Sequence, residues 1–133
     1  TAALFIDYGH TQTQIGDTLQ AVGNHRAVSP LHAPGETDLT AQVDFEAFAL
    51  HCGWPQGGVK AEIDGPVTQA EFLGRLGIVE RASRLMAANP AKAAAIEAGV
   101  ARLIAPSAMG SRFKAIGIRS AGLPKLPGFT IMA

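Results

Sequence analysis

Three side chains suited to acid–base or binding chemistry, Asp7, Tyr8 and His10, follow directly on an apolar run near the start of the chain. Residues 2–6 read AALFI without polar alternation, which is typical of a parallel-sheet strand covered on both faces. Ligands of open α/β sheets bind beyond the carboxyl ends of the strands, so we expect these side chains at a functional rim. Gly9 is predicted to provide the turn out of the strand. The alternative is an ordinary polar loop.

A second candidate region is the segment from residue 11 to residue 43, in which apolar periodicity is weak. Long connections without regular structure are uncommon inside compact domains and are usually functional or mobile. Asp17, Thr18 and His25 lie in this segment and are therefore candidates for binding a substrate. Asp17 could instead cap a short element at residues 18–22, for which a strand and a helical turn fit equally well.

Other catalytic centres have weaker support. Asp7 or Asp17 could complete a metal site with the four histidines, but no H-x-x-x-H or H-E-x-x-H spacing occurs, so no metal is predicted. The four histidines are His10, His25, His32 and His51. Cys52 falls on the apolar stripe of a predicted helix and is interpreted as a core residue rather than a nucleophile. The sequence also lacks a glycine-rich phosphate loop and a G-x-S-x-G elbow.

Composition narrows the class of protein. Eleven basic and eleven acidic residues among 133 give no net charge, so the chain lacks the basic surface expected of a nucleic-acid or anionic-membrane binder. Hydrophobic residues make up 47% and charged residues 17%, which indicates one globular domain. No apolar run approaches the roughly 20 residues that span a bilayer. We expect a soluble, cytoplasmic protein without nucleic-acid or membrane partners.

The first strand is followed by a helix and a second strand. Asp44 can cap a helix that ends at Gly53. After a predicted turn at residues 54–58, alternation over residues 59–63 predicts a strand with one wetter face. These elements form a βαβ unit, for which a right-handed crossover is the default. The apolar stripe of the helix consists of Phe45, Phe48, Ala49 and Cys52.

A clear helix start comes next. Gly65-Pro66 is predicted to close the preceding strand, and Thr68 with Glu71 forms a capping box for a helix that stops at Gly77. A second helix is predicted at residues 78–89.

Asn89 can cap a third helix that begins at Pro90 and ends before Pro106. Residues 112–119 then form a final, mostly apolar strand, for which the intervening helices permit an antiparallel return. Residues 123–128 are interpreted as surface or frayed chain. The buried stripe of the third helix is expected to contain Ile96, Val100, Leu103 and Ile104.

Several stretches, taken in order, resemble the carboxyl-terminal half of the MidA-like family of S-adenosylmethionine-dependent methyltransferases, relatives of the mitochondrial complex I assembly methyltransferase. They are ALFIDYGH, GDTLQAV, a histidine, PGETDLTAQVDF, GPVTQAEFLGRLGI and MGSRFKAIGI, and they span residues 2–118. The resemblance implies an α/β, Rossmann-like class I methyltransferase fold with a helical insertion and an antiparallel last strand beside its predecessor. Residues 1–120 would form the carboxyl-terminal portion of the catalytic domain, and residues 121–133 a tail.

The resemblance also implies S-adenosylmethionine as the cofactor and a protein arginine as the methyl acceptor. A carboxylate would orient the guanidinium through paired hydrogen bonds. Asp7 is the first candidate for this catalytic role, and Tyr8 and His10 would shape the acceptor side. The residues expected to bind the substrate are Asp17, which is also the reserve carboxylate, Thr18 and His25. The alternative is a non-catalytic assembly module on the same fold.

The family's glycine-rich cofactor loop and acidic ribose-binding residue lie upstream of ALFIDYGH, and neither occurs in the 133 residues. We therefore expect the chain to be the carboxyl-terminal part of a longer protein, to bind the cofactor weakly and to be inactive when isolated. A bare edge of the strand at residues 2–6 would pair with the upstream half or with a second copy. Gln42 stands where bacterial relatives often have a histidine, and no role is assigned to it.

Overall fold

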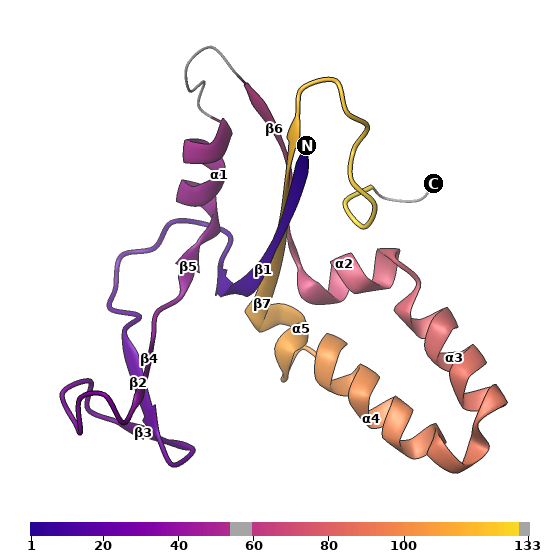
Figure 1. Cartoon of the computed structure of the whole chain (residues 1–133), viewed down its shortest axis with the longest axis horizontal. Coiled ribbons are helices and arrows are strands. Elements are labelled where there is room, and N and C mark those ends of the chain that lie inside the picture. The colour runs from indigo at the N-terminus through magenta and orange to yellow at the C-terminus, as the bar shows by residue number, and fades with distance from the viewer. Residues whose placement is uncertain (54–59, 131–133) are drawn as a thin grey trace.

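A four-stranded mixed sheet forms the centre of the molecule (Figure 1). The computed structural model describes residues 1–53 and 60–130. The strand order is β5-β1-β7-β6; β5 is parallel to β1, and β7 is antiparallel to both β1 and β6. The strands are β1 (Ala2–His10), β5 (Val43–Asp44), β6 (Ala61–Thr68) and β7 (Phe113–Ser120). The predicted α/β class and the insertion of an antiparallel last strand beside its predecessor are therefore confirmed.

Strand β1 extends beyond the predicted apolar run and includes the polar residues up to His10. The prediction that Gly9 provides a turn is wrong, because Gly9 pairs with Val43 of β5 inside the sheet. A Cβ at Gly9 would lie 2.1 Å from the carbonyl oxygen of Val43. Glycine is required here for the close approach of two backbones.

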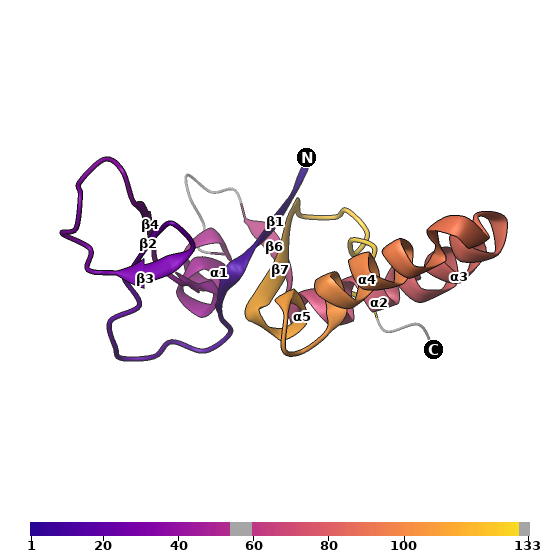
Figure 2. The same cartoon turned by 90° about the horizontal axis from the view of Figure 1, so that it is seen from below.

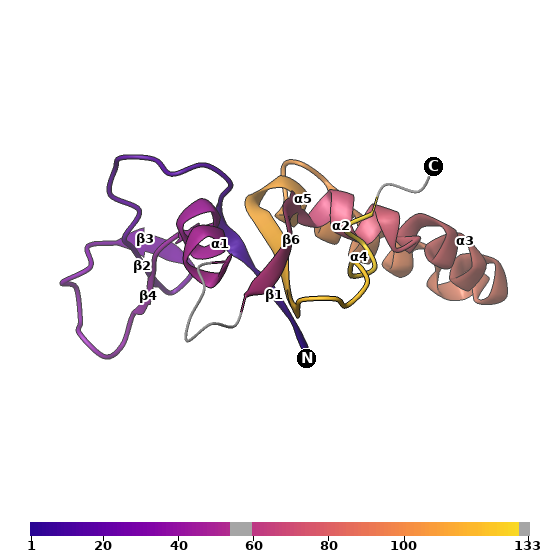
Figure 3. The ribbon, with the colours of Figure 1, turned by 90° about the horizontal axis from the view of Figure 1, so that it is seen from above.

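Helix α1 (Phe45–Gly53) lies on one side of the sheet, and helix α2 (Gln69–Arg75) lies on the other (Figures 1 and 3). The predicted cap of α1 is present, since Asp44 Oδ1 accepts a hydrogen bond from the backbone N–H of Ala47 at 2.9 Å. The predicted turn at residues 54–58 lies outside the described residues.

The capping box of α2 is confirmed in both directions. Glu71 N donates to Thr68 Oγ1 at 3.2 Å, and Thr68 N donates to Glu71 Oε2 at 2.9 Å. Gly77, with φ of +79°, follows the end of the helix, as predicted. These two polar side chains thus fix where the chain leaves β6 and becomes helical.

Two further helices, α3 (Ile78–Ala88) and α4 (Ala93–Ile104), form a pair that projects away from the sheet (Figure 1). A 3-10 turn, η1 (Pro90–Lys92), joins them. Asn89 does not cap this turn with its side chain, because its Nδ2 donates backwards to the carbonyl oxygen of Leu85 at 3.2 Å. The predicted stripe of α4 is only partly buried, and Leu103 in it is exposed.

Strand β6 does not end at Gly65-Pro66, as the sequence suggested, but continues to Thr68. Its register with β7 shifts between Asp64 and Val67, which marks a β-bulge. Gly65 has φ of +94°, a conformation that glycine adopts without a side-chain penalty. The bulge therefore absorbs the glycine and proline that normally terminate a strand.

A second, three-stranded sheet with order β3-β2-β4 lies within the segment between residues 11 and 43, which was expected to be irregular (Figure 2). Its strands are β2 (Gln20–Gly23), β3 (Arg26–Val28) and β4 (Asp38–Thr40). The undecided element at residues 18–22 is thus a strand. Asn24 and His25 have φ of 50° and 60°, which fits the tight hairpin that connects β2 to β3.

Residues 123–128 were interpreted as surface or frayed chain; residues 123–125 and 127 are exposed, as expected of surface chain, but the segment is attached to the rest of the molecule. Phe129 is only 4% exposed and packs in the core beside Phe72, with ring centroids 5.1 Å apart. Upstream in this segment, Leu126 N donates to the buried carboxylate of Asp64 at 2.9 Å. Arg119 Nε donates to the same carboxylate oxygen at 3.0 Å. The hydrogen bond from Leu126 to Asp64 therefore attaches this segment to the sheet, and the contact of Phe129 with Phe72 attaches it to α2.

The apolar residues of β1 are not covered on both faces by the described part of the chain. Leu4, Phe5 and Ile6 are 48%, 44% and 42% exposed. Strand β7 pairs with β1 from Ala2 to Tyr8, whereas β5 pairs with the opposite edge only at Gly9 and His10. Most of one edge of β1 thus has no strand beside it in the described chain. Among the same residues, no helix combines the length and apolarity needed to cross a bilayer.

Candidate functional site

The two neighbouring residues Asp7 and Tyr8 line different cavities, because side chains alternate between the faces of a strand. Asp7 borders a cavity of about 340 Å³, here called the Asp7 hollow. Tyr8 borders a half-open cavity of about 550 Å³, here called the Tyr8 cleft. The structure therefore does not bring all the predicted catalytic residues together in one site.

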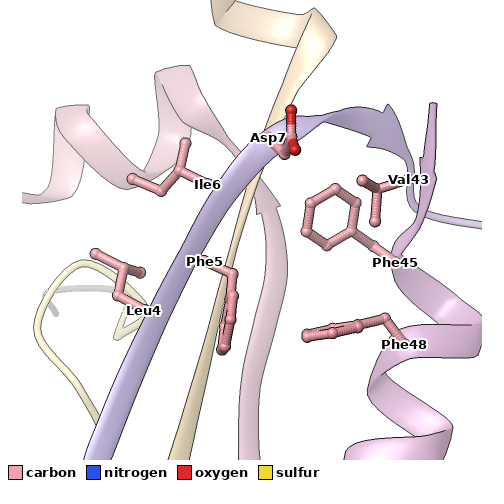
Figure 4. A pocket seen from close by; sticks show the side chains of 7 residues that line it. All are labelled: Leu4, Phe5, Ile6, Asp7, Val43, Phe45 and Phe48. Atoms are coloured by element: carbon pink, nitrogen blue, oxygen red, sulfur yellow. The ribbon is translucent and has the colours of Figure 1, made fainter. Parts of the chain in front are cut away.

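The Asp7 hollow lies between the edge of β1 and helix α1 (Figure 4). Phe5 faces Phe48 across it, with ring centroids 5.2 Å apart in an edge-to-face arrangement. Phe45 is 1% exposed and supports Phe48, with centroids 6.5 Å apart. Asp7 closes the upper end of this aromatic wall in Figure 4. The lining residues are Leu4, Phe5, Ile6, Asp7, Val43, Phe45 and Phe48.

The Asp7 carboxylate is exposed, and one of its two oxygens accepts a hydrogen bond. Its Oδ1 accepts a hydrogen bond from the backbone N–H of Tyr8 at 2.8 Å, which fixes the orientation of the group. Within the described residues, Asp7 takes part in no ion pair, and its Oδ2 accepts no hydrogen bond. An oriented carboxylate beside apolar and aromatic walls can bind a planar cation through hydrogen bonds and ring contacts.

The Tyr8 cleft lies where the carboxyl end of β1 meets the small sheet, helix α5 (Met109–Arg112) and the start of β7. The Tyr8 ring leans on Phe113, with centroids 5.9 Å apart. Its lining residues are Tyr8, Gly9, Gln20, Gln42, Ser111, Arg112, Phe113 and Lys114. Of these side chains, only that of Tyr8 was predicted from the sequence to belong to a site.

Lys114 is a buried cation that lines the Tyr8 cleft and links the backbone segments around it. Its Nζ donates to three backbone carbonyl oxygens: Ser111 at 2.5 Å, Gly9 at 2.9 Å and Arg112 at 3.3 Å. Burial lowers the pKa of Lys114, because the charged ammonium loses hydration. The lysine therefore ties the end of β1 to the end of α5. The only sequence signal was a lysine within a mostly apolar strand.

His10 lies on the other side of this region, beside β5. Its Nδ1 is 2.7 Å from the carbonyl oxygen of Gln12, and its backbone position is paired with Asp44. The pKa of Asp44 is lowered chiefly by the N–H of Ala47; desolvation opposes this effect, while the Thr13 hydroxyl and the charge of His10 add to it. His10 and Asp44 thus contribute to the junction between β1, β5 and α1.

The three predicted substrate-binding residues lie in the segment that contains the small sheet. Asp17 Oδ1 accepts from the backbone N–H of Leu19 at 2.9 Å, which is a local turn interaction. Thr18 Oγ1 accepts from the backbone N–H of Gln42 at 3.2 Å and so supports one wall of the Tyr8 cleft. His25 is exposed in the β2–β3 hairpin and lines neither cavity.

The described residues contain no group of three or more histidine, cysteine, aspartate or glutamate side chains suited to a metal ion. Cys52 is a partly buried free thiol on α1.

Comparison with known proteins identifies relatives of this chain. Residues 1–55 match the model of a family described as "Putative S-adenosyl-L-methionine-dependent methyltransferase". The chain is 38% identical over 130 residues to the mitochondrial protein arginine methyltransferase NDUFAF7 homolog of Drosophila melanogaster, a match covering 94% of this chain and 29% of the relative. It is 37% identical over 114 residues to human NDUFAF7, which covers 84% of this chain and 24% of the relative.

A solved structure is similar over almost the whole chain. It comes from Burkholderia thailandensis, is described as a "likely methyl transferase" and is bound to S-adenosyl-homocysteine. The TM-score is 0.79 at 29% sequence identity, and the match covers 96% of this chain and 34% of the bacterial protein. The chain thus spans about a quarter to a third of the length of these relatives.

Proposed function

This chain belongs to the MidA-like, NDUFAF7-related family of S-adenosylmethionine-dependent methyltransferases and corresponds to a part of its longer members, and from that premise we propose that it forms the acceptor side of a protein arginine methyltransferase. The single observation that supports this role best is the oriented Asp7 carboxylate at the rim of an aromatic hollow. A cytoplasmic location stays a prediction.

The Asp7 hollow has the chemistry that an arginine acceptor needs. A guanidinium is planar and carries its donors in a fork, so a carboxylate can orient it while aromatic rings contact its face. In the hollow, Asp7 provides the carboxylate, and Phe5 and Phe48 provide rings at one wall. We propose that Asp7 holds the acceptor guanidinium and that these rings restrict its rotation.

The residues of this chain fit only one side of a cofactor site. No glycine-rich loop follows β1, because the connection at residues 11–19 contains one glycine, and the sequence has no G-x-G-x-x-G. When bound to a longer family member, S-adenosylmethionine would supply the methyl group. The contribution of this chain would be to hold the acceptor nitrogen in line and to exclude water with the apolar walls of the hollow.

We further propose that the open edge of β1 pairs with another α/β segment, equivalent to the remaining part of the longer relatives. Leu4 and Ile6 extend to one side of the strand and Phe5 to the other in Figure 4, so both faces beside this edge are apolar. A second cavity of about 230 Å³, lined partly by Leu4 and Phe129, lies on the side opposite α1. A neighbouring strand with apolar residues on both faces would fill both cavities.

The β1 pairing can be tested by hydrogen exchange. Amides of β1 that point to the open edge should exchange rapidly in the 133-residue protein and be protected in the longest natural polypeptide that contains it. Light scattering tests whether a second copy of the chain pairs with this edge instead. A stable dimer at high concentration would indicate that it does. Equal exchange in both polypeptides, with both folded and monomeric, would refute a pairing at this edge.

A non-catalytic assembly module is the second candidate function, and the exposed apolar residues of β1 favour it. The two functions differ in cofactor binding. We would titrate S-adenosylhomocysteine into the longest natural polypeptide and into the 133-residue protein by calorimetry. Binding by the longer form alone is expected for the methyltransferase, whereas two folded polypeptides that both fail to bind would favour the assembly module.

A further inference from the structure

The Tyr8 cleft has an unusual charge balance for a protein that acts on arginine. Arg112 and Lys114 are the charged residues among its eight lining residues, and the other six carry no formal charge. A guanidinium entering this cleft would therefore meet two positive charges and no carboxylate. The cleft and the Asp7 hollow share no lining residue, although Asp7 of the hollow and Tyr8 of the cleft are adjacent in β1, so they can serve different parts of one ligand.

The two cations differ in what they can offer. Lys114 has three N–H donors, and backbone carbonyl oxygens already occupy all of them, so it contributes a fixed positive field. The Arg112 side chain is exposed and takes part in no hydrogen bond or ion pair with the part of the chain that the structure describes. Its donors are thus available to a ligand that enters from solvent.

Neutral polar groups complete the cleft. Gln20 reaches it from β2 of the small sheet and Gln42 from the link between β4 and β5, and both are exposed. The hydrogen bond from Gln42 N to Thr18 Oγ1 fixes the backbone at this wall. Amide side chains and the Tyr8 hydroxyl can donate as well as accept hydrogen bonds, so they suit an extended peptide with its own donors and acceptors.

We infer that the Tyr8 cleft binds an acidic segment of a protein ligand, with Arg112 contacting a carboxylate. This inference deepens the proposed function and rests on it in one respect, namely that the acidic segment belongs to the methyl acceptor protein. The acceptor arginine of that protein would lie at Asp7, and an acidic residue of the same protein would lie at Arg112. A cavity of about 550 Å³ has room for a short stretch of peptide.

The binding test uses the 133-residue protein without cofactor. An acetylated and amidated peptide with two glutamates, Gly-Glu-Gly-Glu-Gly, is titrated and followed by NMR, beside the same peptide with glutamines. The glutamate peptide should shift the amide signals of Gly9, Gln42 and Arg112. Arg112→Gln should weaken its binding about tenfold, the size expected for losing a hydrogen bond to a charged group. Arg112→Lys should restore part of the loss.

Arg102→Gln is the matched control, because Arg102 is an exposed arginine in the last turn of α4 and does not line the cleft. Equal binding of the two peptides, no binding of either, or equal losses in Arg112→Gln and Arg102→Gln would overturn the inference. Tighter binding of inorganic phosphate than of the glutamate peptide would also overturn it. Calorimetry with S-adenosylhomocysteine tests the proposed function separately, so a failure of either proposal can be recognised.

Discussion

Gly9 and Val43 lie so close that a Cβ on Gly9 would be 2.1 Å from the carbonyl oxygen of Val43. This approach pairs β5 with β1 and thereby places helix α1, with Phe45 and Phe48, against the Asp7 hollow. We expect Gly9→Ala to destabilise the protein by about 1–3 kcal/mol or more, because the obstacle is backbone and cannot rotate away. Urea unfolding followed by circular dichroism measures the change.

Gly99→Ala is the control for this substitution. Gly99 lies within α4, and a Cβ there would have no atom within 4 Å. Alanine favours a helix by up to about 1 kcal/mol over glycine, so this variant should be more stable than the wild type. Equal effects of the two substitutions would show that β1 and β5 are not held as closely as the structure indicates.

The capping box at Thr68 and Glu71 should make stability depend on pH. The backbone N–H of Thr68, and then its hydroxyl, lower the pKa of Glu71 below its ordinary value of 4.5. A lowered folded-state pKa stabilises the protein above that ordinary value, and the contribution is lost as the pH falls through the folded pKa. We expect Glu71→Gln to be less stable than the wild type at pH 7, with a difference that shrinks under acid conditions.

Thermal unfolding across this pH range gives the measurement. Glu97→Gln, an exposed position within α4, should show no comparable pH-dependent difference. Thr68→Ala removes the other half of the box and should cost about 1 kcal/mol at pH 7. A wild-type minus Glu71→Gln difference that stays constant between neutral and acid pH would argue against this hydrogen-bonded carboxylate.

Phe129 anchors the segment after β7 and should be as important as a residue of the central sheet. It is 4% exposed and contacts Phe72 in the core. We expect Phe129→Ala to cost about 3–5 kcal/mol, the usual range for truncating a buried phenylalanine. Leu123→Ala, in the same segment but 39% exposed, should cost much less. Similar unfolding free energies for the two variants would mean that the segment is only loosely attached.

Local signals in the sequence predicted the starts of α1 and α2 well. Thr68 with Glu71 and Asp44 with the stripe of α1 are short-range patterns, and both form the hydrogen bonds expected of them. The long-range features were harder to predict. The necessity of Gly9 depends on Val43, which is 34 residues away, and the burial of Phe129 depends on Phe72. Such contacts leave no periodic trace in the chain.

The candidate site was predicted only in part for the same reason. Asp7 and Tyr8 were expected to act together as neighbours, but strand geometry sends them to opposite faces. The small sheet was missed because its strands have only three or four residues, too few for alternation to be recognised. Lys114 was missed because its partners are backbone carbonyl oxygens, which any sequence could provide.

The proposed role of Asp7 predicts a specific loss of methyl transfer. In the longest natural polypeptide that contains this stretch, Asp7→Asn keeps the shape of the side chain but removes the charge that orients a guanidinium. We expect kcat/KM for the arginine-containing protein substrate to fall by about 10²-fold, the scale of a misplaced reacting group. Binding of S-adenosylhomocysteine should be unchanged, because Asp7 is assigned to the acceptor side.

Asp38→Asn, the same chemical change on exposed β4, is the control. If the two variants transfer methyl groups equally well, Asp7 does not orient the acceptor, whereas a loss of cofactor binding in Asp7→Asn would move this carboxylate to the cofactor side.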